Sequence, residues 1–297
     1  RPGMMIGLDF TQQYILKLGI IFLGIRLSFE EFIKFGTTAI PLIIVCIIGV
    51  LILIKLLIKK VPISSKMSYL IAIGTSVCGA TAIVATAPVI NAKKTEIAYA
   101  IANITLFGVI AMILYPYFAE WYFEGEAINS GLFLGTSIHE TSQVAAAGLI
   151  YDQQFNSPET LNVATVTKLI RNTFLVIMIP LFAFLYNRGE IKSEKYSILS
   201  IFPFFVIGFI GMIIVRNLGD QFFTTEKSNY EIWVNLIEYI KILATVFLTM
   251  AMAAVGISIN LSELKSMGYK PFVVGLIAAI TVGIISLVYI EISTKII

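Results

Sequence analysis

Long apolar runs, separated by short polar loops, cover most of the sequence. A run of about 20 residues can cross the roughly 30 Å hydrocarbon core of a bilayer as a helix. Seven runs are close to this length: Tyr14–Phe29, Thr38–Ile58, Ile97–Phe118, Val163–Tyr186, Ile198–Val215, Tyr239–Ile259 and Pro271–Ile290. The pattern predicts an all-α, polytopic membrane protein with about seven spanning helices.

Two further apolar runs, Met67–Ile90 and Ile128–Tyr151, are interrupted near their middle. Each interruption begins with Gly-Thr-Ser and continues with small or polar residues, as in "GTSVCGAT" and "GTSIHETSQ". Irregular backbone at membrane depth is tolerated only where it is buried in protein or lines a wet cavity. We therefore expect two broken helical segments that meet near the midplane of the bilayer.

The charges beside the two broken segments differ in sign. Lysines flank the first segment, at Lys59, Lys60, Lys66, Lys93 and Lys94. Acidic residues flank the second, at Glu120, Glu124, Glu126, Asp152 and Glu159. Because short cytoplasmic loops are enriched in Lys and Arg, both flanks of the first segment are expected inside and both flanks of the second outside. These charges favour two re-entrant hairpins that enter from opposite faces, with two crossing discontinuous helices as the alternative.

Composition agrees with a membrane protein. Of the 297 residues, 58% are hydrophobic and 13% charged, whereas soluble domains have about 45–50% and 25%. The net charge of +3 is too small to indicate binding to nucleic acid, and Cys46 and Cys78 lack the spacing of metal ligands. We expect one transmembrane domain over residues 1–297, and we expect that upstream residues are absent, because the sequence opens without an initiator methionine.

Two distant segments of the sequence resemble each other. Leu23–Gly36 ("LGIRLSFEEFIKFG") and Val255–Gly268 ("VGISINLSELKSMG") align without gaps and share two glycines, an isoleucine and a glutamate. Counting the spans gives the helices before them opposite orientations, which predicts an inverted repeat. Inverted repeats with paired broken helices are typical of secondary transporters, whose substrate site lies near the midplane.

Hydroxyl side chains stand at both breaks, at Thr75, Ser76, Thr136 and Ser137. Where a helix restarts after a break, its first N–H groups lack intrahelical partners and its dipole is positive, which suits an anion. The hydroxyls can cap these helix starts or donate to a ligand, and we predict that they bind substrate. The alternative is that they only satisfy backbone groups.

Two cations, Lys168 and Arg171, lie three residues apart and therefore on nearly one helix face. An ionised side chain at the bilayer centre costs roughly 2.5–3.5 kcal/mol, so both are expected to face a wet cavity or an opposite charge. We predict that both bind substrate. Lys168 lies nearer the end of its predicted helix, and snorkelling to the interface is its alternative role.

His139, the only histidine of the sequence, and Glu140 follow the second break directly. Ionisable groups at membrane depth mark a functional site by default, so we predict that His139, Glu140 and Gln143 couple or gate transport. Glu140 would neutralise Arg171 when the site is empty, and His139 would carry a coupling proton. The alternative is a polar pair that locks the segment by hydrogen bonds.

The segment "HETSQ" begins like the zinc-protease motif H-E-x-x-H. Gln143 stands where the second histidine of that motif should be, and the sequence has no other histidine. This difference argues against a zinc hydrolase. We expect no enzyme activity, no bound metal and no cofactor.

Several longer motifs resemble a known family. The runs "LKLGIIFLGIRLSFEEF", "GTSVCGATAIVATAPVI", "LFGVIAMILYP", "GTSIHETSQVAAAG" and "KLIRNTFLVIMIP" are similar to those of the YeiH-type sulfate exporter family of bacterial inner-membrane proteins. The resemblance covers nearly the whole chain. It departs from the family in two places: Thr141 and Ser142 stand where small apolar residues are more usual, and one or two N-terminal helices of the family are missing from this transporter domain. It implies a fold related to the cation/proton antiporter and bile-acid transporter group, which would favour crossing discontinuous helices.

These observations predict a secondary transporter of a small anion, namely sulfate or an organic sulfonate or carboxylate, in the bacterial inner membrane. Its expected partners are the lipid bilayer, the anion, and H⁺ or Na⁺ as coupling ion. A homodimer is left open, and no nucleic acid is expected. A passive channel, a ligand-binding membrane sensor and a Na⁺- or H⁺-coupled transporter that uses Glu140 are the alternative functions.

Overall fold

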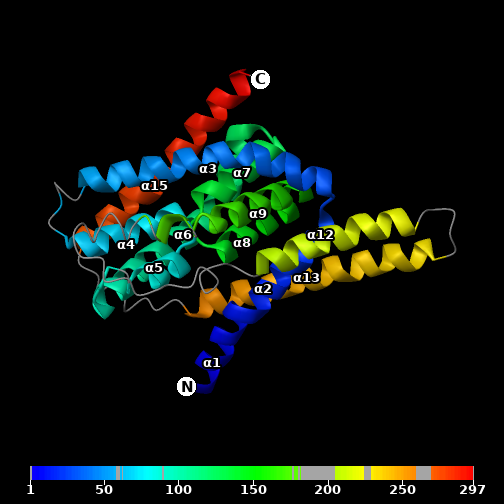
Figure 1. The fold of residues 1–297 in the computed structure, drawn as a ribbon, viewed down its shortest axis with the longest axis horizontal. Coiled ribbons are helices and arrows are strands. Elements are labelled where there is room, and N and C mark those ends of the chain that lie inside the picture. Colours follow the sequence, from blue (N-terminus) through cyan, green and yellow to red (C-terminus); the bar gives the residue numbers. More distant parts are fainter. Residues whose placement is uncertain are drawn as a thin grey trace. The chain divides into compact units, whose positions relative to one another are not determined.

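The computed structural model describes residues 2–57, 61, 63–88, 90–175, 177–179, 181, 205–223, 229–258 and 269–296. Every regular element within these ranges is helical (Figure 1), which confirms the all-α prediction. Five of the described helices are long and apolar enough to cross a membrane. They are α3 (Phe29–Leu57), α6 (Lys94–Phe123), α12 (Phe205–Phe222), α13 (Tyr230–Ser258) and α15 (Tyr269–Ile296).

Four of these helices coincide with predicted spans. α3, α6, α13 and α15 each begin before the corresponding apolar run, because the helix continues into polar residues that the run excludes. α12 covers the second half of the predicted span Ile198–Val215, and the earlier part of that span lies outside the described residues. The second copy of the predicted repeat, Val255–Gly268, also lies mostly outside them. The inverted repeat therefore stays a prediction.

The predicted span Tyr14–Phe29 has different bounds in the structure. The chain runs from α1 (Pro2–Phe10) through a π-helical turn into α2 (Leu16–Leu23) and then leaves the helix. The Ser28 backbone N–H donates to the Glu31 carboxylate at 2.8 Å, and the Glu31 N–H donates to the Ser28 hydroxyl at 3.1 Å. This reciprocal cap starts α3 at Phe29, which the hydrophobic pattern alone did not reveal.

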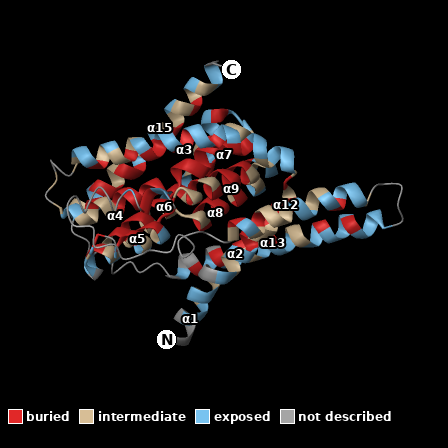
Figure 2. Cartoon of the chain, viewed as in Figure 1, coloured by how far each residue is buried: buried red, intermediate tan, exposed pale blue. Residues whose placement is uncertain are grey.

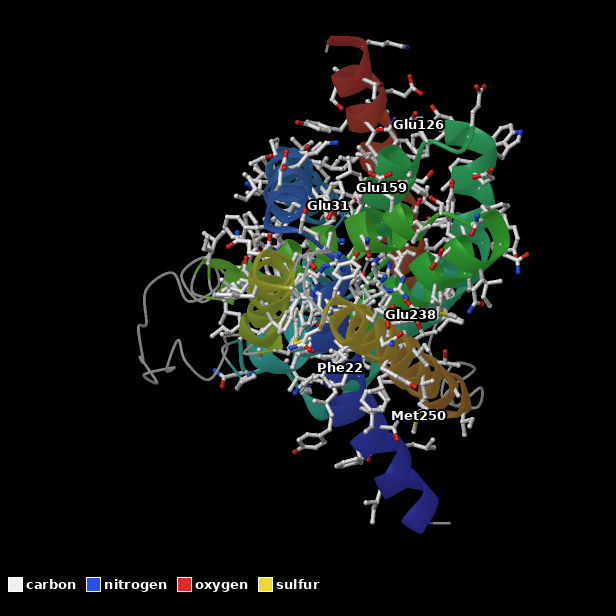
Figure 3. All side chains as sticks on the ribbon, turned by 90° about the vertical axis from the view of Figure 1, so that its right-hand side faces the viewer. Phe22, Glu31, Glu126, Glu159, Glu238 and Met250 are labelled. Carbon is white, nitrogen blue, oxygen red and sulfur yellow. The ribbon has the colours of Figure 1, made fainter. Side chains whose placement is uncertain are left out.

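The chain divides into two compact units. The first comprises Arg1–Thr37 and Pro203–Ile259, and the second comprises Thr38–Phe202 and Asn260–Ile297. In the first unit, α2 packs against α12 and α13, and Phe22 stacks on Phe247 with ring centroids 5.9 Å apart. Figure 3 labels Phe22 and Met250, which belong to this unit. The candidate site lies entirely in the second unit, and one transmembrane domain over residues 1–297 stays a prediction.

The first broken segment forms a helical hairpin. α4 (Ser65–Ser76) and α5 (Ala80–Thr86) run antiparallel, separated by a three-residue break. At the open end of the hairpin, the Lys66 ammonium donates to the Asn91 carbonyl at 2.6 Å. Nearer the tip, Gly74 leaves room for the side chain of Ile83.

The second broken segment also forms a hairpin. α7 (Ala127–Ser137) and α8 (Thr141–Phe155) are joined by a three-residue break. The Ser130 and Tyr151 hydroxyls lie 3.2 Å apart, so the start of α7 lies beside the end of α8. The structure thus has the hairpins that the flanking charges favoured, and the crossing helices that the family resemblance favoured are absent from these two segments.

The long helix α6 shows that the hairpins open toward opposite ends of the second unit. The Ser64 hydroxyl, at the base of the first hairpin, donates to Glu96 in the first turn of α6. The Tyr151 hydroxyl, at the base of the second, donates to Glu120 near the other end of α6 at 2.5 Å. These two glutamates are about 36 Å apart along the helix at 1.5 Å per residue, more than the roughly 30 Å hydrocarbon core. Hairpins that enter a membrane from opposite faces would have this arrangement.

Helix α9 (Pro158–Thr173) packs against both arms of the second hairpin. Most residues of α7, α8 and α9 are buried (Figure 2). Glu126 and Glu159, at the starts of α7 and α9, lie at the same end of the unit (Figure 3). α9 begins before the predicted span Val163–Tyr186 and ends within it, so Lys168 and Arg171 lie in its last two turns.

Gly135 allows α7 and α9 to approach closely. A Cβ atom added there would lie 2.7 Å from the Thr167 Cβ and 2.8 Å from the Ala164 carbonyl oxygen. Small residues commonly permit such contacts between membrane helices. The contact fixes the distance between the tip of the second hairpin and the cations of α9.

Gly135→Ala is expected to lower the melting temperature of the purified protein. The added methyl group must displace the α9 backbone, and such overpacking costs about 1–3 kcal/mol. The matched control is Gly211→Ala in α12, where an added Cβ has no neighbour within 4 Å. We expect the control to melt at the wild-type temperature or slightly higher, because alanine favours helix. Equal melting temperatures for the two variants would contradict the close approach.

Candidate functional site

The Gly-Thr-Ser motifs lie at the ends of α4 and α7 and not in the breaks themselves. Helical hydrogen bonds continue past both motifs, from the Val77 N–H to the Ile73 carbonyl at 3.0 Å and from the Ile138 N–H to the Leu134 carbonyl at 3.3 Å. The expectation that their hydroxyls cap the restarting helices is therefore wrong. Thr75, Ser76, Thr136 and Ser137 belong to the negative, C-terminal ends of the first arms.

The tip of each hairpin is its break together with the adjoining helix ends, residues 75–80 in the first and 136–141 in the second. The two tips meet at Gly79 and Glu140. Gly79 has φ of +65°, a backbone conformation that favours glycine. A Cβ atom added at Gly79 would also overlap the Glu140 Cγ. Only glycine satisfies both constraints, so the approach of the two tips depends on this position. The predicted meeting of the two broken segments is confirmed.

Lys168 joins the two tips through backbone carbonyl groups. Its ammonium donates to the Val77 carbonyl of the first tip at 3.1 Å. It also donates to the Ile138 and His139 carbonyls of the second tip at 3.0 and 2.5 Å. The side chain is fully buried, so it does not snorkel to an interface.

Arg171 joins the same two tips one turn later. Its Nε donates to the Ser76 carbonyl at 2.8 Å, and its Nη2 donates to the Thr75 carbonyl. Its Nη1 donates to the Thr136 carbonyl of the second hairpin. Both cations thus satisfy carbonyl groups, at the ends of α4 and α7 and in the second break, that have no intrahelical partners.

Neither cation forms an ion pair with a carboxylate in the part of the chain that the structure describes. The ion pairs found within the described residues are Arg216–Asp220, Lys241–Glu238 and Lys295–Glu291. The predicted neutralisation of Arg171 by Glu140 is therefore not a direct ion pair in this structure. Within the described residues, the hydrogen bonds of the two fully buried cations go to neutral carbonyl groups, and Glu140 lies close enough to Lys168 for an electrostatic interaction.

Glu140 caps the restarting helix α8 with Gln143. Its carboxylate accepts the Gln143 N–H, and the Gln143 amide oxygen accepts the Glu140 N–H at 3.2 Å. The Glu140 carboxylate also accepts the Ala80 N–H of the first hairpin and the Thr105 hydroxyl of α6, both at 3.4 Å. For Glu140, these contacts support the alternative role that we left open, in which a polar group locks the segment by hydrogen bonds.

Several buried polar atoms around the tips lack a hydrogen-bond partner. Among the described residues they include Thr75 Oγ1, Ser76 Oγ, Ser137 Oγ, His139 Nδ1, Thr167 Oγ1 and Asn172 Oδ1. Buried polar groups are normally paired, so a group of unpaired ones makes this region a candidate binding site. Thr136 differs from the other predicted hydroxyls, because it donates to Leu132 and pairs with Ser286 at 2.7 Å.

The structure places eight of the predicted site residues in or beside the hairpin tips: Thr75, Ser76, Thr136, Ser137, His139, Glu140, Lys168 and Arg171. The ninth, Gln143, lies one turn into α8. Thr105 and Ser286 were missed. Each is one of the few hydroxyl residues in a long apolar helix, and that pattern could have marked them. The described residues contain no cluster of three or more His, Cys, Asp or Glu side chains that could hold a metal ion.

Comparison with known proteins identifies relatives over nearly the whole chain. A family described as conserved hypothetical protein 698 matches residues 2–275. A UPF0324 membrane protein of Fusobacterium nucleatum is 34% identical over 288 residues, which cover 95% of this chain and 82% of that protein. A UPF0324 membrane protein of Streptococcus agalactiae is 36% identical over 281 residues, covering 94% and 80%.

A third relative, a UPF0324 membrane protein of Clostridium tetani, is 31% identical over 295 residues, covering 94% of this chain and 80% of the relative. No solved structure matches the chain. The extent of these matches, together with the membrane-length helices, confirms the family resemblance of the motifs and the predicted location in the membrane. The chain belongs to the UPF0324 family of multi-pass bacterial inner-membrane proteins.

Proposed function

We propose that this membrane protein is a secondary transporter of a small anion, with its site at the two hairpin tips. The observation that carries the proposal is the pair of fully buried cations, Lys168 and Arg171, neither of which forms an ion pair with a carboxylate of the described residues. Each buried charge costs roughly 2.5–3.5 kcal/mol at the bilayer centre. A bound anion would offset part of this cost, so the site favours binding of negative charge.

The chemistry of the site supports an oxyanion such as sulfate, a sulfonate or a carboxylate. Arg171 uses three of its nitrogen atoms on carbonyl groups, and its guanidinium keeps further N–H donors. The unpaired hydroxyls of Thr75, Ser76 and Ser137 are neutral donors at the same turns. The positive charge of the two cations and the hydroxyl donors beside them together suit an oxyanion.

The hairpins supply a route for alternating access. They open toward opposite ends of α6, and their tips meet at the cations. Movement of one tip would expose the cations toward one face while the other tip keeps the opposite face closed. Broken helical elements that meet near the midplane serve this role in many secondary transporters.

Glu140 is proposed to act as the gate. Its carboxylate lies at the positive start of α8 and accepts the Ala80 N–H of the other tip. A substrate anion that approaches the cations would be repelled by this negative charge. Displacement or neutralisation of Glu140 would therefore accompany anion binding, and His139 beside it is the proposed carrier of a coupling proton.

Arg171→Gln is expected to weaken anion binding at least about tenfold, equivalent to about 1.4 kcal/mol. The substitution removes the positive charge that attracts the anion. The measurement is the melting temperature of the purified protein during titration with sulfate, methanesulfonate, acetate and larger sulfonates and carboxylates. Wild-type protein should be stabilised by at least one of these anions.

The matched control for Arg171→Gln is Arg216→Gln in the first unit. Arg216 pairs with Asp220 at 2.6 Å and is partly exposed, so its loss should leave the anion response unchanged. Arg171→Lys keeps the charge without the guanidinium fork and should bind with intermediate affinity. Wild-type protein that no anion stabilises, or an unchanged affinity in Arg171→Gln, would refute the anion site.

Glu140→Gln is expected to strengthen anion binding. Glutamine keeps an oxygen acceptor for the Ala80 and Thr105 donors but removes the repelling charge. The same anion titration measures the effect, and Glu159→Gln at the far end of α9 is the control that removes a distant carboxylate. If instead Na⁺ stabilises the wild-type protein and this response is lost in Glu140→Gln, the cation-coupled alternative is favoured.

Reconstituted protein is expected to exchange anion across the vesicle membrane with saturation and counterflow. Radiolabelled sulfate uptake should accelerate when unlabelled substrate is present inside the vesicles, because a carrier returns faster when loaded. A passive channel would show flux with neither saturation nor counterflow. Anion binding without any flux would indicate a sensor.

A further inference from the structure

The contacts of the Lys168 ammonium are unusual for a buried lysine. A buried charge is normally paired with an opposite charge, whereas all three hydrogen bonds of this ammonium go to backbone carbonyl oxygens. One oxygen belongs to Val77, the residue that ends α4, and two belong to Ile138 and His139 in the second break. Three carbonyl oxygens from two hairpins therefore converge on one point of positive charge.

Converging carbonyl oxygens are the ligands of alkali metal ions in membrane proteins. Backbone carbonyls replace the hydration shell of an ion in channel filters. In transporters with discontinuous helices, unwound carbonyls and the C-terminal ends of half-helices coordinate Na⁺. The ligands of Lys168 are of both kinds, a helix C-terminal carbonyl and carbonyls of an unwound turn.

We propose that the Lys168 ammonium is a tethered substitute for a coupling sodium ion. It occupies a monovalent-cation site formed by the Val77, Ile138 and His139 carbonyls, and it holds the two tips together as a bound Na⁺ would. The wild-type protein therefore needs no Na⁺. Removal of the ammonium leaves a vacant site with affinity for Na⁺.

The surroundings of the site favour a monovalent ion. Ser76 and Ser137, at the ends of α4 and α7 next to these carbonyls, also carry buried hydroxyls that have no hydrogen-bond partner. The described residues offer no acidic cluster that would select a divalent ion. Replacement of an ammonium by Na⁺ also conserves the charge between the tips.

Arg171 provides a natural comparison within the same site. It too is fully buried and donates to three carbonyls, but each carbonyl is bound by a different nitrogen of the planar guanidinium. The oxygens are therefore spread around a plane and do not converge on one atom. Loss of Arg171 should open no sodium site, although it removes the same charge from the same place.

The test compares the full chain and its variants in detergent, in NaCl and in choline chloride of equal concentration. Wild-type protein should melt at the same temperature in both salts. Lys168→Ala should melt at a lower temperature in choline chloride and should gain stability as Na⁺ replaces choline. Arg171→Ala and Lys168→Arg are the matched controls, and neither should respond to Na⁺.

A Lys168→Ala protein that responds to Na⁺ no more than Arg171→Ala would overturn the proposal. Stabilisation of the wild-type protein by Na⁺ over choline would overturn it as well, and this measurement holds even if Lys168→Ala does not fold. Recovery of folded Lys168→Ala only from Na⁺-containing buffer would support it. The inference does not rest on anion transport, because both salts contain only chloride and the sodium response can be present whether or not another anion binds.

Discussion

The arrangement of the site depends on the backbone carbonyl groups that have no intrahelical partner where α4 and α7 end. Water can satisfy such groups in a soluble protein, but inside a membrane protein each needs an internal donor. Lys168 and Arg171 supply six hydrogen bonds to six carbonyls from the two tips. These hydrogen bonds therefore offset both the free-energy cost of burying two cations and the cost of leaving the carbonyl groups of two interrupted helices unpaired.

The rest of the second unit positions these donors. α9 must lie close enough to α7 for Arg171 to reach the Thr136 carbonyl, and Gly135 permits this approach. The Thr105 hydroxyl of α6 donates a hydrogen bond to Glu140. Near the two ends of α6, Glu96 and Glu120 accept hydrogen bonds from the open ends of the two hairpins. The site is therefore a meeting point of four chain segments, in which no single helix contributes both the cations and their acceptors.

The sequence predicted the main elements of this arrangement because they depend on local pattern. Apolar run length located the long helices, loop charge favoured the hairpins, and the cost of intramembrane charge singled out Lys168 and Arg171. The acceptors of these cations were not predictable, since a sequence does not show which carbonyls face a side chain. The Gly-Thr-Ser motifs were misplaced by a few residues, because their hydroxyls interrupt the apolar pattern without interrupting the helix.

Each cation binds both tips, and this explains how one site could open to only one side at a time. If the first tip moved away, Lys168 would lose the Val77 carbonyl and Arg171 would lose those of Thr75 and Ser76, but both would keep partners on the second tip. If both tips moved, both cations would lose every carbonyl partner and remain buried without compensation. That state costs far more than either single opening, because an unpaired buried charge costs several kcal/mol. In the proposed transport cycle, an anion that enters from the open side would replace the lost carbonyls as the partner of the cations, which would link occupancy of the site to closure of the tip.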